Sequence, residues 1–206
     1  MCGRFENTRL EKEILELFRS ANLNVEIDSG ISNRSDQDFR SKEDIRPTEK
    51  IISVILGNDI YRITRVNWGI KFSDASPLIF NSRIETIKEK RYWASLFSKN
   101  RCIVPMTGFY EWNQIGKRKQ KYRIFLPDQE LFFVPAIYHK DKEDKIFASL
   151  ITTGPNKFIK TIHHRMPVIL DFKNAVDFLN EESVANLERC IPYDDNKPME
   201  LEEADK

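Results

Sequence analysis

The clearest local pattern in the chain is a helical one near its N-terminus. Apolar side chains recur there at the spacing of a single helical face, at Leu10, Ile14, Leu17 and Phe18. Thr8, followed three residues later by Glu11, has the form of a capping box. We therefore expect a short strand that carries Cys2, followed by a helix over about residues 9–19.

Beyond residue 50 the apolar runs are mostly short and rich in β-branched and aromatic residues, which is typical of strands. The expected strands cover residues 51–56, 60–68, 101–105, 108–113, 122–126, 131–138, 145–153 and 166–170. Gly57, Asn58 and Asp59 predict a hairpin turn between the first two strands. Many strands joined by short turns indicate sheets that are mostly antiparallel.

Helices interrupt this pattern at a few places. Aromatic and apolar residues predict one over residues 92–97. Pro155 fits the first turn of a short helix, and Asp171 is placed to cap another that reaches Leu179. The fold class that follows is α+β, with antiparallel, barrel-like sheets and a few peripheral helices.

The length of 206 residues fits one domain over residues 1–206. Residues 20–46 are polar and lack periodicity, which predicts a surface loop insertion, and the acidic tail over residues 194–206 is expected to fray. A hydrophobic content of 40% is enough for a packed core, and a net charge of +1 means that any nucleic-acid contact needs a local basic face.

The cysteines, Cys2, Cys102 and Cys190, are odd in number and far apart, which argues against a disulfide framework and a zinc site. We expect no metal and no cofactor. Neither a signal peptide nor a run of about 18 apolar residues is present, so we expect a cytoplasmic monomer that is neither secreted nor membrane-bound.

Cys2 offers unusual chemistry if Met1 is removed. Its thiol and its α-amine would then lie on adjacent carbons, and an α-amine has a pKa of about 7.7–8.0, well below that of lysine. Such a 1,2-aminothiol condenses with an aldehyde to an imine and then to a five-membered thiazolidine. The same pair can act as an N-terminal nucleophile on an amide, while the plainest alternative is a cysteine that only packs.

Three further polar positions are candidates for this chemistry. Asn81 follows an apolar run, Glu111 lies between two aromatic residues of an expected strand, and His163 precedes another strand. An apolar setting raises the pKa of a carboxyl group, and histidine is the other natural acid or base near neutral pH. Each also has a structural explanation, because a strand carboxylate often faces solvent and a lone histidine is often structural.

The chain resembles the SRAP family, SOS-response-associated peptidase-like proteins that sense abasic sites in single-stranded DNA. The matching segments occur in family order at residues 1–5, 68–70, 81–86, 101–105, 108–112, 151–153 and 163–167. The resemblance implies the SRAP-type fold and a covalent thiazolidine between mature Cys2 and the ring-opened sugar of an abasic site. It also implies a role in shielding the lesion during the DNA damage response, with weak lyase and autoproteolytic activities as possible companions.

The same resemblance implies roles for individual residues. Asn81 would orient the Cys2 amine or the sugar, Glu111 would transfer protons, and His163 would help to open the sugar ring. The residues that would contact DNA fall into two groups, phosphate-binding arginines and base-stacking tryptophans: Arg4, Arg83 and Arg165, with Trp68 and Trp112. For either tryptophan, packing in the core is the alternative. The basic run over residues 117–121 is interpreted as a solvated turn and is not counted as a site.

Two other functions fit the same residues. A cysteine peptidase or N-terminal amidohydrolase would use Cys2 as the nucleophile and Asn81 as an oxyanion donor. A non-catalytic single-stranded DNA-binding module would rely on the arginines and tryptophans alone. The alternatives differ in substrate and in their need for Cys2.

Overall fold

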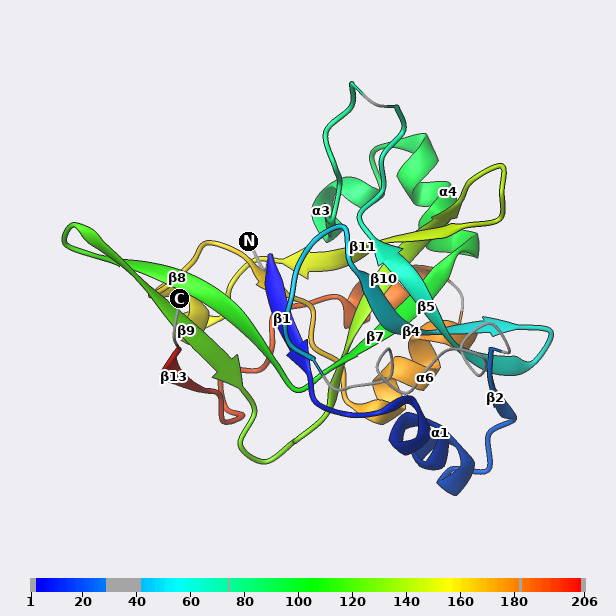
Figure 1. The fold of residues 1–206 in the computed structure, drawn as a ribbon, viewed down its shortest axis with the longest axis horizontal. Helices are drawn as coiled ribbons and strands as arrows, with labels where there is room; N and C mark the ends of the chain where they lie inside the picture. Colours follow the sequence, from blue (N-terminus) through cyan, green and yellow to red (C-terminus); the bar gives the residue numbers. More distant parts are fainter. Residues whose placement is uncertain (1–2, 29–41, 74, 182, 205–206) are drawn as a thin grey trace.

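The structure, a computed structural model, describes residues 3–28, 42–73, 75–181 and 183–204. Cys2 and residues 29–41 of the expected loop insertion over residues 20–46 therefore lie outside the described residues. Within that insertion, a helix ends and one short strand forms before residues 29–41, and a second short strand forms after them. The described chain forms a mixed α+β fold with most of its strands in two sheets (Figure 1).

The first sheet is antiparallel and five-stranded. Its strands, in spatial order, are β13 (Glu200–Ala204), β9 (Arg118–Phe125), β8 (Gly108–Ile115), β1 (Arg4–Asn7) and β3 (Lys42–Ile45). Beyond the start of β1, β8 and β9 continue as a hairpin that projects from the body as an arm (Figure 1).

The second sheet closes into a ring. Its main path runs through β12 (Met166–Pro167), β11 (Ile146–Thr153), β10 (Phe132–Lys140), β7 (Arg101–Met106), β4 (Lys50–Gly57), β5 (Ile60–Trp68) and β2 (Val25–Ile27). The ring closes because β5 also pairs with β11, in parallel. On the same edge of β11, the short strand β6 (Asn81–Arg83) continues the parallel pairing. The expectation of mostly antiparallel, ring-like sheets is thus confirmed.

The helices lie outside the sheets (Figure 1). They are α1 (Glu11–Ser20), α3 (Ile84–Ile87), α4 (Arg91–Lys99), α5 (Lys157–Lys160), α6 (Phe172–Asn180) and α7 (Ser183–Arg189). As predicted, Asp171 caps α6, accepting a hydrogen bond of 2.8 Å from the Asn174 backbone N–H. The turn between β4 and β5 has the expected conformation as well, because Asn58 and Asp59 have φ angles of 52° and 58°.

Three local predictions were wrong. The N-cap of α1 is Leu10, and Glu13 rather than Glu11 accepts a hydrogen bond of 2.7 Å from the Leu10 backbone N–H. Pro155 precedes the N-cap of α5, Asn156, so it lies outside the first turn. The acidic tail does not fray throughout, because β13 pairs with β9 in an antiparallel register and Arg123 forms an ion pair with Glu202.

Trp68 lies at the centre of the core between the two sheets. It has no exposed surface, and its ring packs edge-on against Phe5 of β1 and against Phe80, with ring centroids 5.0 and 5.9 Å away. Its indole N–H donates a hydrogen bond of 2.9 Å to the Phe80 carbonyl. Trp68 therefore fixes β1 relative to the segment that immediately precedes Asn81.

Candidate active site and DNA-contact residues

Glu111 lies on β8, directly beside the first residues of β1. Arg4 pairs with Tyr110 and Phe5 with Phe109, so the same register continued by one residue sets Gly3 opposite Glu111. Only 2% of the surface of Glu111 is exposed. This burial raises the pKa of Glu111 to about 7. A carboxyl group that titrates near neutral pH can both take up and release a proton in a reaction.

Asn81 begins β6, which runs parallel to the end of β11. Asn81 pairs with Leu150, and two residues later Arg83 pairs with Thr152. Asn81 is half-buried, whereas Arg83 is exposed to solvent. This position places an amide side chain at the end of the ring-shaped sheet, close in sequence to a cation that faces water.

His163 lies in the turn between α5 and β12. Its Nδ1 atom lies 3.0 Å from the Arg165 backbone nitrogen and 3.2 Å from the Arg165 carbonyl oxygen, so the Arg165 backbone orients the ring in either neutral tautomer. Burial lowers the pKa of His163, which favours the neutral form. Its ring stacks on that of His164 with 4.3 Å between centroids. His163 is thus held as a neutral imidazole at neutral pH.

Arg165 joins the Asn81 and His163 segments. Its guanidinium donates hydrogen bonds of 2.7 and 2.9 Å to the two carboxylate oxygens of Glu85, and one of 2.7 Å to the Thr152 carbonyl. Its side chain is only 10% exposed. The expectation that Arg165 holds a phosphate requires the phosphate to displace Glu85, because the guanidinium is already paired and nearly buried. Arg165 instead positions the loop that carries His163.

Arg4 and Trp112 lie together on the face of β8 opposite to Glu111. Successive side chains of a strand point to opposite faces, so Trp112 and Glu111 are separated by the sheet. The guanidinium of Arg4 lies 5.5 Å from the centre of the half-buried Trp112 ring. Asp44 accepts a hydrogen bond of 2.6 Å from the same guanidinium. A phosphate that binds Arg4 must therefore compete with Asp44.

Trp68 was expected to stack on a DNA base, and its position in the core contradicts this. A side chain without exposed surface cannot receive a base unless the core opens. Residue type alone left stacking and core packing both open, and the choice depended on contacts with Phe5 and with strand β11, which lie far away in sequence. Its packing on Phe5 and Phe80 links the N-terminal strand to the Asn81 segment, so its role is to position the site.

A buried carboxylate behind β1 was not found from the sequence. Glu6 is 3% exposed and accepts hydrogen bonds of 2.8 Å from the Tyr110 hydroxyl, 3.1 Å from the Thr107 hydroxyl and 2.8 Å from Arg123. Three donors to one carboxylate fix β1 against β8 and β9. No local signal could have revealed this network, since its donors lie about a hundred residues further along the chain.

Two general properties of the described residues bear on the chemistry. They contain no group of three His, Cys, Asp or Glu side chains arranged to hold a metal ion. Among them, no helix is both long and apolar enough to cross a membrane.

Known proteins resemble this chain along nearly its whole length. The family model described as SOS response associated peptidase (SRAP) matches residues 1–204. Abasic site processing protein YoaM of Bacillus subtilis is 29% identical, with 94% of this chain and 87% of that protein aligned. YedK of Escherichia coli, which carries the same description, is 26% identical over 88% of this chain and 81% of that protein.

Solved structures share the fold. A crystal structure of a protein from Bacteroides thetaiotaomicron superimposes with a TM-score of 0.75 at 26% identity, and covers 97% of this chain and 91% of that one. A second, from Bordetella bronchiseptica, reaches a TM-score of 0.77 at 13% identity with both chains covered completely, a likeness of fold alone.

Proposed function

The chain belongs to the SRAP family, and on that premise we propose that it captures abasic sites in single-stranded DNA by covalent attachment through Cys2. The observation that carries this proposal is the carboxyl group of Glu111, which is buried beside the start of β1 with a pKa of about 7. Gly3, which is bonded to Cys2, is one residue from the paired part of β1. A proton-transfer group thus lies next to the strand that leads to the nucleophile.

The proposed reaction balances without a cofactor. Once Met1 is removed, the neutral α-amine of Cys2 adds to the aldehyde carbon of the ring-opened sugar. The resulting carbinolamine loses one water to give an imine, and the sulfur then adds to the imine carbon while the thiol proton passes to nitrogen. One C–N bond and one C–S bond form, one water leaves, and the product is a thiazolidine that covers the lesion.

Each candidate residue has a step in this reaction. Glu111 takes a proton from the attacking amine and returns it to the departing hydroxyl, a dual role that suits a pKa of about 7. His163, whose pKa is lowered by burial, donates a hydrogen bond to the sugar ring oxygen as the ring opens. Asn81 orients the amine or the sugar through its amide. The imine also activates the sugar for β-elimination, which would give a weak lyase activity.

DNA contacts follow from the surroundings of these residues. Arg83 is exposed and is the predicted arginine best placed to bind a phosphate. Trp112 retains exposed surface and offers a ring on which a base can stack. Hydrolysis of peptide bonds is the alternative chemistry of the same nucleophile. The description of the family as a peptidase supports this alternative.

A denaturing gel tests the proposal directly. The purified protein, with its intact mass measured to establish that it begins at Cys2, is mixed with single-stranded DNA that contains one abasic site. We expect a heat-stable protein–DNA band that is absent with intact DNA and with Cys2→Ala. Cys190→Ala, which alters a cysteine buried in the hydrophobic core, should still form the band. No band from protein that begins at Cys2 would refute aldehyde capture, and turnover of a peptide would favour the peptidase.

A further inference from the structure

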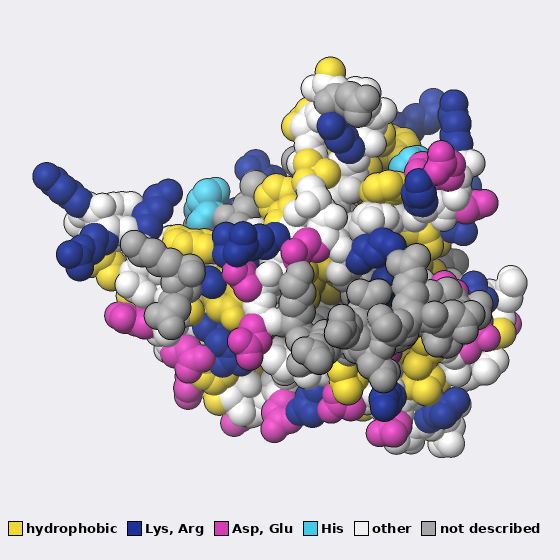
Figure 2. Space-filling view, in the orientation of Figure 1, with side chains coloured by type: hydrophobic (Ala, Val, Ile, Leu, Met, Phe, Trp, Pro, Cys, Tyr) yellow, Lys and Arg dark blue, Asp and Glu magenta, His cyan; other side chains and the backbone are white. Residues whose placement is uncertain are grey.

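The arm formed by β8 and β9 carries the most concentrated positive charge near the candidate site. Between Trp112 and Lys121 the sequence contains four cationic residues and no carboxylate. Lys117, Arg118 and Lys119 form the end of the hairpin and are exposed, directly after Gly116 with its φ of 60°. Figure 2 shows Lys and Arg side chains gathered at the free end of this arm.

These three cations are available to an external anion. Among the residues that the structure describes, none of the three forms an ion pair, whereas Arg4 is bound to Asp44 and Arg165 to Glu85. A paired cation gains little from a phosphate because it must first give up its carboxylate. Among the described residues, Lys117, Arg118 and Lys119 therefore join the exposed Arg83 as cations near the candidate site that have no carboxylate to give up.

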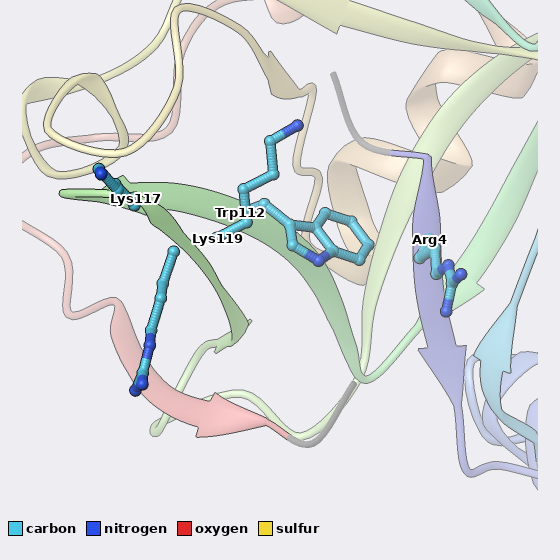
Figure 3. A pocket seen from close by; sticks show the side chains of 5 residues that line it. Arg4, Trp112, Lys117 and Lys119 are labelled. Carbon is cyan, nitrogen blue, oxygen red and sulfur yellow. The ribbon is translucent and has the colours of Figure 1, made fainter.

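The arm and the N-terminal strand enclose a groove. It has a volume of about 450 Å³ and is lined by Arg4, Trp112, Lys117, Arg118 and Lys119. Figure 3 shows the ring of Trp112 lying between the hairpin and Arg4, with the basic side chains distributed around it. In the hairpin register Gln114 pairs with Lys119 and Trp112 with Lys121, so Lys119 shares the face of Trp112. An aromatic ring flanked by unpaired cations is the combination that binds single strands without sequence preference.

We propose that this groove is an anchoring site for the nucleotides on one side of the abasic site. The proposal rests on the function proposed above, and it names the hairpin end as the group that binds the flanking phosphates. Trp112 stacks on a base within the groove, and Lys117, Arg118 and Lys119 neutralise the sugar–phosphate backbone beyond it. This anchoring is independent of covalent chemistry, so it acts on intact single-stranded DNA as well.

The length of the arm sets the reach of the contact. From Glu111 to Gly116 the strand advances five residues, which at about 3.3 Å per residue is roughly 16 Å. A nucleic-acid strand with about 3.4 Å per nucleotide covers this distance in about five nucleotides, and a more extended strand in fewer. DNA with a flank of a single nucleotide on the relevant side cannot reach the hairpin end.

The experiment compares two triple variants with the wild-type protein. The test variant is Lys117→Gln/Arg118→Gln/Lys119→Gln. The control, Lys140→Gln/Lys142→Gln/Lys145→Gln, removes as many charges from the turn between β10 and β11, on the other side of the molecule (Figure 1). Fluorescence anisotropy measures the affinity for intact single-stranded DNA at several salt concentrations, and gels measure the crosslinking of abasic DNA with long or single-nucleotide flanks on either side.

We expect the test variant to bind intact DNA about ten-fold more weakly at low salt, with a salt dependence of log K less steep by about 2, since each single-strand phosphate contact contributes about 0.7. The control variant should behave as wild type. At saturating DNA the test variant should crosslink as wild type does. Below saturation it should crosslink less DNA than wild type, and shortening the flank on one side should abolish this difference.

The outcomes separate the two proposals. If the test and control variants have equal affinity and salt dependence, the anchoring site is refuted, even where the wild-type protein forms the covalent band. If wild type forms no covalent band but the test variant still loses affinity for intact DNA, covalent capture is refuted and the groove remains a DNA-binding site. If shortening either flank has the same effect on the difference between the test variant and wild type, the assignment of the groove to one side of the abasic site is refuted.

Discussion

Replacement of Glu111 by glutamine should stabilise the protein and impair its chemistry. The substitution keeps the size of the side chain but removes its ability to ionise. Glu111 is almost completely buried, and burial raises its pKa from an ordinary value of 4.5 to about 7. At about 1.4 kcal/mol for each pKa unit, ionisation of this group in the folded protein costs about 3 kcal/mol of stability.

The direction of the change in stability with pH follows from which state, folded or unfolded, loses the Glu111 proton at the lower pH. Below pH 4.5 Glu111 is protonated in both the folded and the unfolded chain, so its ionisation takes nothing from the stability of the fold. Between pH 4.5 and 7 the unfolded chain releases its proton while the folded chain holds it, so stability falls as the pH rises. Above pH 7 both states are ionised and the loss is constant. Glutamine is neutral throughout and avoids this loss.

Urea unfolding at pH 5 and pH 8 measures the effect. Relative to wild type, Glu111→Gln should gain roughly 2–3 kcal/mol in unfolding free energy on going from pH 5 to pH 8. Glu16→Gln, which alters an exposed carboxylate on α1, is the matched control and should follow wild type at both pH values. In parallel, Glu111→Gln should form the covalent DNA adduct about 10²- to 10⁴-fold more slowly, the usual contribution of a positioned acid or base.

Two results would refute this reasoning. If the difference in unfolding free energy between Glu111→Gln and wild type is the same at pH 5 and pH 8, Glu111 does not titrate in this range. If the variant shows the stability gain but crosslinks at the wild-type rate, the raised pKa is real and has no part in the chemistry.

The remaining predictions concern the residues around the site. Asp44→Asn should remove the ion pair with Arg4 and tighten binding of single-stranded DNA up to about five-fold, as measured by anisotropy, because a partly exposed ion pair is worth at most about 1 kcal/mol; weaker binding would contradict this. Trp68→Phe should lower the unfolding free energy by about 1–3 kcal/mol through loss of the hydrogen bond to Phe80 and of packing, and leave DNA affinity unchanged; a ten-fold loss of affinity would restore its role in stacking. Glu6→Gln should cost about 1–3 kcal/mol in urea unfolding, because it weakens the hydrogen bonds that three donors make to a buried carboxylate, and an unchanged unfolding free energy would refute that reasoning.

Elements that depend on nearby residues were predictable from the sequence. The helix α1 follows from apolar spacing, the turn at Asn58 and Asp59 from residues that tolerate positive φ, and the start of α6 from the capping carboxylate of Asp171. In each case the decisive contacts lie within about four residues. The strand over residues 200–204 was missed because an edge strand rich in glutamate has no pattern of its own and forms only against β9.

The roles of the arginines depended on distant partners. Sequence comparison treats Arg4, Arg83 and Arg165 alike, yet Asp44 and Glu85 engage the first and the last and leave Arg83 exposed. A guanidinium binds a phosphate or a carboxylate equally well, so residue type cannot decide between the two. Lys117, Arg118 and Lys119, in the run that the sequence pattern interpreted as a solvated turn, likewise have no described ion pair.

By itself, the sequence determined the α+β class, most strand and helix positions, and the residue types able to carry aldehyde chemistry, because these depend on local periodicity and on intrinsic reactivity. The tertiary structure decided which of those residues are accessible and how they ionise. It buried Trp68, brought Glu111 beside the first strand in a setting that raises its pKa, and separated Trp112 from it by the thickness of a sheet. Burial and charge pairing arise between residues far apart in the chain, and they exist only after the chain has folded.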